Sequence, residues 1–136
     1  MRKPLKLPEG LFPVESFFNA LDATRLKKAL ASFATGHGYA PEDRTCDFPA
    51  DRAEEEGGPA ERFNSIEFWT YAGNEDVQIS FDDFVEHLNT VVDDQKAADS
   101  GNADDWEAAR IAAVQKVREI VAKAHNYRRD SEGPSS

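Results

Sequence analysis

Apolar side chains recur at helical spacing over most of the C-terminal half of the chain. From Phe81 onward, apolar residues follow at intervals of three and four, at positions 84, 85, 88, 91 and 92. Ser80 stands before this stripe and Asp83 three residues after Ser80, which is the form of a capping box, so a helix is expected over 81–94. A final helix is expected over 104–125, with Asn102 or Asp104 as its cap, because apolar residues from Trp106 to Ala124 fall on one side.

The N-terminal part has a less regular helical pattern. Apolar residues at 17, 18 and 21 fit one stripe and those at 26, 30 and 33 fit another, but the step of five between positions 21 and 26 breaks the period. Glycine follows at position 36. We therefore expect two short helices over 14–35, or one helix broken near Asp22, with Gly36 as the terminator.

Alternation replaces the helical period between residues 63 and 80. In an extended segment over 63–71, one side would carry Ile66, Phe68 and Thr70, and the other side Glu67, Trp69 and Tyr71. Turn residues at 72–75 precede a second short strand over 76–80, in which Val77 and Ile79 are in phase. The two strands are expected to pair as an antiparallel hairpin.

Residues 40–62 contain three prolines and the pair Gly57-Gly58, so an irregular surface segment is expected there, held by Phe48 at most. Together the elements predict an α+β fold, a small single domain with helices packed on an antiparallel β-hairpin or small sheet. The 136 residues are the size of one domain. We expect a flexible N-terminal segment at 1–12, the domain at 13–126 and a flexible polar tail at 127–136.

Charge is unevenly distributed along the chain. The net charge is −10, but residues 40–105 carry 19 acidic and four basic side chains, a net charge of −15 between basic ends. An acidic chain cannot neutralise phosphates, which excludes a general binder of nucleic acid and disfavours anionic membranes as partners. The acidic block is either an ordinary solvated face or a recognition surface for a basic protein or a metal ion.

Nothing in the sequence assembles a reaction centre. The three histidines have no spacing that would ligate a metal, the acidic pairs do not match an EF-hand loop, and no glycine-rich phosphate loop is found. The single cysteine, Cys46, excludes an internal disulfide, indicates a reducing compartment such as the cytoplasm, and is expected to be a small buried hydrophobe. We therefore expect no catalytic residue, no metal, no cofactor and no membrane span.

Three groups of residues are candidates for contact with a basic partner. A loop group consists of Asp47, Asp51, Glu54, Glu55 and Glu56, a strand group of Glu67, Trp69 and Tyr71, and a helix group of Asp82, Glu86 and Asp93. The helix group forms an acidic stripe beside the apolar one, and Asp93 lies where the helix dipole disfavours an acid. Exposed Trp and Tyr beside a carboxylate are typical of interface hot spots, although a second packed layer could cover that side of the strand.

The order of core residues and turns resembles a known family. The matching residues are Phe17-Phe18-x-x-Leu21, Gly38-Tyr39, Cys46-Asp47-Phe48-Pro49, Phe63-x-x-Ile66-x-Phe68 and Val77-x-Ile79-Ser80-x-x-x-Phe84-x-x-x-Leu88. Over residues 12–125, and most strongly over 36–92, this order is similar to the immunity proteins of contact-dependent growth inhibition, specifically the ribonuclease toxin immunity protein CdiI family. A longer insertion containing Gly57-Gly58 and a proline-rich N-terminus set this chain apart from that pattern.

The resemblance implies a cytoplasmic binding protein without enzymatic activity. Such a protein forms a 1:1 complex with the C-terminal toxin domain of a CdiA-type protein and blocks its active site or substrate groove. Because a ribonuclease binds a polyanion, its groove is basic, and an acidic inhibitor can occupy it. Two other hypotheses stay open at this point: a small carboxylate-based metal-binding enzyme, and a housekeeping acidic adaptor for a basic protein.

Overall fold

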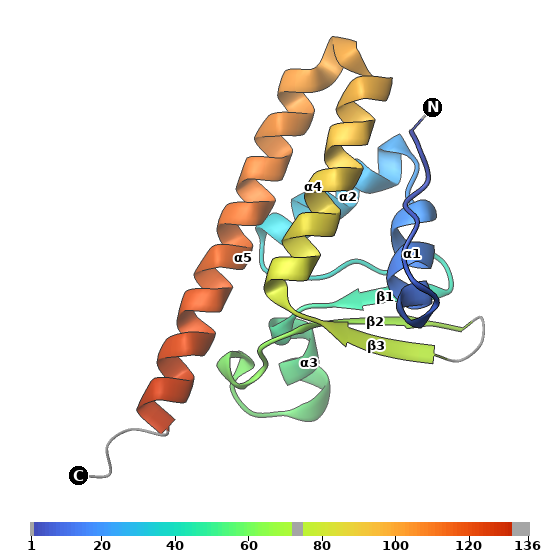
Figure 1. The fold of residues 1–136 in the computed structure, drawn as a ribbon. Helices are drawn as coiled ribbons and strands as arrows, with labels where there is room; N and C mark the ends of the chain where they lie inside the picture. Colours follow the sequence, from blue (N-terminus) through green and yellow to red (C-terminus); the bar gives the residue numbers. More distant parts are fainter. Residues whose placement is uncertain (1, 72–74, 132–136) are drawn as a thin grey trace.

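A three-stranded antiparallel sheet lies at the centre of the molecule, with most of the helices on one of its faces (Figure 1). The computed structural model describes residues 2–71 and 75–131. The strands lie in the order β1 (Arg44–Asp47), β2 (Ile66–Thr70) and β3 (Glu75–Ile79). The predicted α+β fold, with helices packed on a small antiparallel sheet, is confirmed.

The two N-terminal helices are separate, as one of the two expectations had it. Helix α1 spans Phe12–Asn19 and α2 spans Ala23–Ala34. Asp22 begins α2 as its N-cap, because its Oδ1 accepts a hydrogen bond of 2.8 Å from the backbone N–H of Arg25. Gly36 follows the end of α2 with a φ of 89°, a left-handed conformation that glycine adopts readily.

Residues 2–8, predicted to be flexible, lie along α1. Leu5 is only 9% exposed, and its backbone N–H and C=O bond to the side-chain amide of Asn19 at 2.7 and 2.9 Å. The Arg2 guanidinium donates to the backbone oxygen of Phe18, near the C-terminal end of α1, at 3.0 Å. These contacts come from single side chains distant in sequence, so periodicity could not have predicted them.

The expectation of an irregular segment over 40–62 is wrong, because this stretch contains β1 and helix α3 (Pro49–Glu56). Strand β1 exists through pairing with β2, in which Cys46 lies opposite Phe68. Helix α3 carries proline at its first position, where the missing N–H loses no helical bond. Phe48, between the two elements, is fully buried, so the segment is anchored in the core.

The hairpin is confirmed in shorter form. Strand β2 begins at Ile66 instead of residue 63, and β3 ends at Ile79, with Phe68 opposite Val77 and Trp69 opposite Asp76. Residues 72–74 of the predicted turn lie outside the described residues. The burial of β2 alternates strictly, with Ile66, Phe68 and Thr70 inside.

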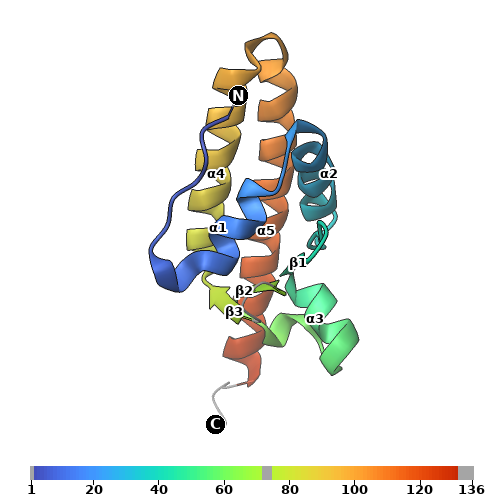
Figure 2. The same ribbon diagram turned by 90° about the vertical axis from the view of Figure 1, so that its right-hand side faces the viewer.

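Both C-terminal helices are longer than predicted. Helix α4 (Phe81–Ala98) starts where the capping pattern placed it, since the Ser80 hydroxyl accepts from the Asp83 N–H at 3.0 Å. Helix α5 (Ala103–Ser131) continues through residues 127–131, which the sequence placed in the polar tail. No glycine or proline interrupts either helix, so backbone hydrogen bonding continues beyond the apolar stripe. Helix α5 runs alongside α4 and α2 (Figures 1 and 2).

The core between the helices and the sheet is dominated by phenylalanine. Six rings are completely buried and pack against one another at tilted, stacked or edge-to-face angles, namely Phe17, Phe18, Phe33, Phe48, Phe68 and Phe84. Such aromatic packing adds to the stabilisation from apolar burial. Cys46 is 1% exposed within this core, so the prediction of a small buried hydrophobe is confirmed.

Candidate functional site

The outer face of the sheet carries the aromatic pair that the alternation of β2 predicted. Trp69 is partly exposed and Tyr71, just after the strand, is 65% exposed. Their ring centroids lie 4.2 Å apart with an interplanar angle of 66°. Helix α3 lies on this side of the sheet (Figure 1) and leaves Trp69 partly and Tyr71 largely exposed.

Strand register surrounds Trp69 with acidic side chains. Thr45 of β1 and Asp76 of β3 are its direct neighbours across the sheet, while Asp47 lies opposite Glu67 in the adjacent row. Directly opposed side chains on one face have Cβ atoms about 4.5–5.5 Å apart. With one residue from α3 they line an open hollow of about 520 Å³, which we call the sheet hollow: Thr45, Asp47, Glu55, Glu67, Trp69 and Asp76.

The sheet hollow brings together residues from two of the three predicted groups and adds two that were missed. Asp47 and Glu55 come from the loop group, and Glu67 and Trp69 come from the strand group. Asp76 could have been found, because it occupies the phase opposite to Val77 in a predicted strand. Thr45 could not, because it lies in the segment where no strand was expected.

Electrostatic repulsion is concentrated in this hollow. Burial raises the pKa of Asp47 to about 6, and repulsion from Glu55, Asp51 and Glu67 adds to the effect of burial. Burial also raises the pKa of Glu67, with Asp76, Glu56 and Glu55 acting in the same direction. The positive charge of Arg52 opposes both shifts. No hydrogen bond or ion pair to the Asp47 carboxylate is formed by the described residues, so its charge is not compensated by direct contact.

Replacing Asp47 with asparagine is expected to stabilise the free protein at neutral pH. The folded state protonates this carboxyl near pH 6 and the unfolded state near 3.8, so ionised Asp47 disfavours folding above pH 6, and that penalty disappears as pH falls toward 3.8. In urea unfolding at pH 7.5 the variant should gain about 1 kcal/mol in free energy of unfolding, less than the full pKa shift implies because solvent screens a partly exposed group.

At about pH 4 the gain should vanish, because wild-type Asp47 is then neutral in the folded state. Glu54→Gln, which alters an exposed carboxylate on α3, is the matched control and should change the free energy of unfolding at neither pH. A gain of equal size at both pH values would contradict this account of Asp47.

Asp51 has a structural part that the sequence did not reveal. Its Oδ2 accepts from the backbone N–H groups of Gly38 and Phe48 at 2.7 and 2.8 Å, and its Oδ1 lies 2.8 Å from Nδ1 of His37. The carboxylate thus joins the loop after α2 to the start of α3. A side chain at Gly38 would place its Cβ 1.7 Å from the backbone oxygen of Cys46, which explains why glycine stands there.

The remaining predicted residues lie elsewhere. Glu54 and Glu56 are exposed on α3, and Glu56 lies 3.8 Å from Arg52 and 4.0 Å from Arg62. The helix group Asp82, Glu86 and Asp93 is exposed on α4 and does not line the sheet hollow. Asp93 is bonded to Arg110 at 2.6 Å. The structure therefore separates two acidic surfaces that the sequence could only list together.

Other features of the described residues carry less chemistry. No group of three or more histidine, cysteine, aspartate or glutamate residues in this part of the chain could hold a metal ion. Burial raises the pKa of the Cys46 thiol well above its usual value, which disfavours the nucleophilic thiolate. None of the described helices is both long and apolar enough to cross a bilayer.

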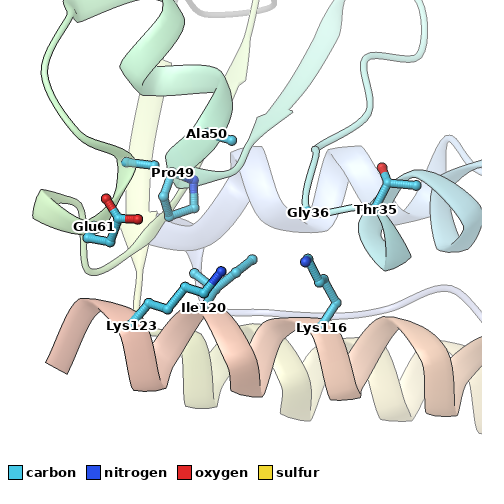
Figure 3. Close-up of a pocket in the computed structure, with 9 residues that line it drawn as sticks. Thr35, Gly36, Pro49, Ala50, Glu61, Lys116, Ile120 and Lys123 are labelled. Carbon is cyan, nitrogen blue, oxygen red and sulfur yellow. The ribbon is translucent and has the colours of Figure 1, made fainter. Parts of the chain in front are cut away.

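A smaller cavity of about 180 Å³ lies between α3 and α5 (Figure 3). Pro49, Ala50 and Ile120 form apolar walls, and the side chains of Lys116 and Lys123 extend from α5 into the space between the two helices. Glu61 is its one acidic lining residue. This cavity is a gap between two packed helices that is lined by basic side chains. Its lining residues do not include a nucleophile in contact with a base.

Comparison with protein-family models, with curated proteins and with solved structures finds no match for this chain. The resemblance to immunity proteins therefore stays a prediction, and the inference of function rests on the geometry of the surface.

Proposed function

We propose that this chain is an immunity protein, a non-enzymatic inhibitor that binds a basic toxin domain, most simply a ribonuclease. The observation that carries the proposal is the sheet hollow, in which the partly exposed ring of Trp69 is surrounded by carboxylates from three strands and α3, with the exposed ring of Tyr71 packed against it. Aromatic rings in a charged surround provide contact area and specificity, which are the features of a protein interface.

The chemistry of the partner follows from the charge of the hollow. A ribonuclease groove presents lysine and arginine side chains to RNA. In a complex, these side chains could pair with the four carboxylates of the sheet hollow, those of Asp47, Glu55, Glu67 and Asp76. Complementary charge accelerates association and disfavours wrong partners. The aromatic rings, which the partner would cover in the complex, determine how slowly the complex dissociates. The raised pKa of Asp47 supports this use, because a cationic partner would relieve the repulsion present in the free protein.

The decisive experiment co-expresses this chain with the C-terminal domain encoded by the gene directly before its own. If the proposal is right, growth is rescued and a 1:1 complex co-purifies.

A divalent-ion titration by calorimetry tests the rival hypothesis of a metal-binding enzyme, which predicts heat of binding. A housekeeping adaptor would instead bind a basic protein that is not toxic. Persistent toxicity with no complex would refute the immunity proposal.

The two acidic surfaces provide a matched pair of variants for that complex. Asp47→Lys with Glu67→Lys reverses two of the four charges of the sheet hollow, and Asp82→Lys with Glu86→Lys reverses two charges on α4. At low salt, the first pair should slow association at least about tenfold, and the second should leave the association rate within about twofold. The opposite ranking would place the interface on α4.

A further inference from the structure

Arg52 is a buried cation behind the sheet hollow. The residue is 8% exposed, its guanidinium carbon lies 4.3 Å from the centroid of the Phe63 ring, and its Nη1 donates to the Ser65 hydroxyl at 3.2 Å. The nearest counterion atom is Oε2 of Glu56, 3.8 Å from the Nε, and this Nε has no hydrogen-bond partner within the described part of the chain.

The hydrogen bonds of Arg52 lead to the row of carboxylates that lines the hollow. Ser65, which accepts from Arg52, donates in turn to Oε1 of Gln78 on β3 at 2.8 Å. Gln78 lies directly opposite Glu67 in the sheet, and Glu67 lies directly opposite Asp47. The chain of hydrogen bonds therefore joins α3 to β3 beside this row.

Stability alone does not explain a buried arginine at this position. Burying a charge carries a desolvation penalty, and replacing a buried ion pair with apolar side chains of similar volume is often neutral or stabilising. The acidic residues around Arg52 offset this desolvation penalty. Glu55, Asp51, Asp76 and Glu56 repel the carboxylates of Asp47 or Glu67, which also repel each other, whereas Arg52 attracts both.

We propose that Arg52 is a positioning residue of the binding surface: its buried guanidinium, bonded to Ser65 and through Ser65 to Gln78, places a positive charge beside the row of Asp47 and Glu67 and so maintains this acidic surface for a cationic partner. This inference rests on the proposed function for its biological meaning. The electrostatic part of it concerns the free protein and can be measured there.

The first test titrates the side-chain carboxyl groups of the free protein by carbon-13 NMR. Arg52→Met should raise the titration midpoints of Asp47 and Glu67 by about 0.5–1 pH unit, because an attractive charge is removed. Arg52→Lys, which retains the charge, should move them less. Arg62→Met is the matched control, since Arg62 lies 4.6 Å from the same Phe63 ring but pairs with Glu56, whereas Arg52 bonds to Ser65.

Unmoved midpoints in Arg52→Met would overturn the inference, whatever the partner proves to be. If Arg52→Met does not fold, Arg52→Gln makes the same measurement with a polar side chain. A shift of equal size in Arg62→Met would also overturn it, because the effect would then belong to the general charge of this surface.

The second test measures the affinity for the toxin domain at two pH values. Arg52→Met should bind several-fold more weakly than wild type at pH 6.5, and the difference should narrow at pH 8, where the carboxylates are ionised again. An equal loss at both pH values would assign Arg52 a purely structural role and overturn the inference. If no toxin domain binds although the midpoints move, the proposed function fails while the electrostatic role of Arg52 stands.

Discussion

Replacing Trp69 with alanine is expected to weaken binding of the proposed toxin domain at least about 30-fold, or about 2 kcal/mol. Trp69 stands at the centre of the sheet hollow, between Thr45 and Asp76 across the sheet and with Tyr71 against its ring. Trp69→Ala removes the indole ring, which is the largest apolar contact area of the hollow, and leaves an unfilled space between the carboxylates. The effect should therefore be mainly on dissociation.

The free Trp69→Ala protein should remain folded, because the ring faces outward and β-propensity accounts for at most about 1 kcal/mol. Ile111→Ala is the matched control, since Ile111 is 55% exposed on α5 and does not line the hollow. Binding measured by calorimetry and stability measured by urea unfolding check the two parts. An affinity within about threefold of wild type would remove the sheet hollow from the interface.

Replacing Phe84 with alanine is expected to lower the free energy of unfolding by about 3–5 kcal/mol. This ring is completely buried, and its centroid lies 5.3 Å from Phe33, 5.4 Å from Phe48 and 6.2 Å from Phe68. It therefore joins α4 to α2, to the start of α3 and to the inner side of β2. The loss is a large part of the 5–15 kcal/mol that usually stabilises a domain.

Phe12→Ala provides the comparison for Phe84→Ala, because it deletes the same atoms from a ring that is 40% exposed at the start of α1. Its loss should stay below about 1 kcal/mol, as less apolar area leaves water on folding. Urea unfolding of both variants at neutral pH measures the difference. Similar losses in the two variants would show that the phenylalanine cluster is not the main source of stability.

The sequence pattern predicted the elements whose apolar residues follow a clear helical or strand period. The stripe from Phe81 identified α4, and the alternation around Phe68 identified β2 and its two sides. Strand β1 was missed because four residues have no detectable period, and it exists only through pairing with β2. Helix α3 was missed because Pro49 looked like a helix breaker, although proline is well tolerated at the first helical position.

The candidate site was predictable in its parts and not in its assembly. Asp47, Glu55, Glu67 and Trp69 could each be named, but strand register decides that Asp47 meets Glu67 while the acidic stripe of α4 lies elsewhere. Asp51 and Arg52 form hydrogen bonds with partners distant in sequence, such as Gly38 and Ser65, which no pattern of spacing reveals.

The strict alternation of β2 also bears on how such a protein could evolve. The core contains Ile66, Phe68 and Thr70, whereas Glu67 and Trp69 face the other side of the sheet and line the hollow. The proposed recognition residues and the core residues therefore occupy interleaved positions of the same five-residue strand. Mutation at the outward positions can change which partner is bound without disturbing the packed rings beneath them. A lineage of such proteins could follow a diverging partner while retaining one unchanged scaffold.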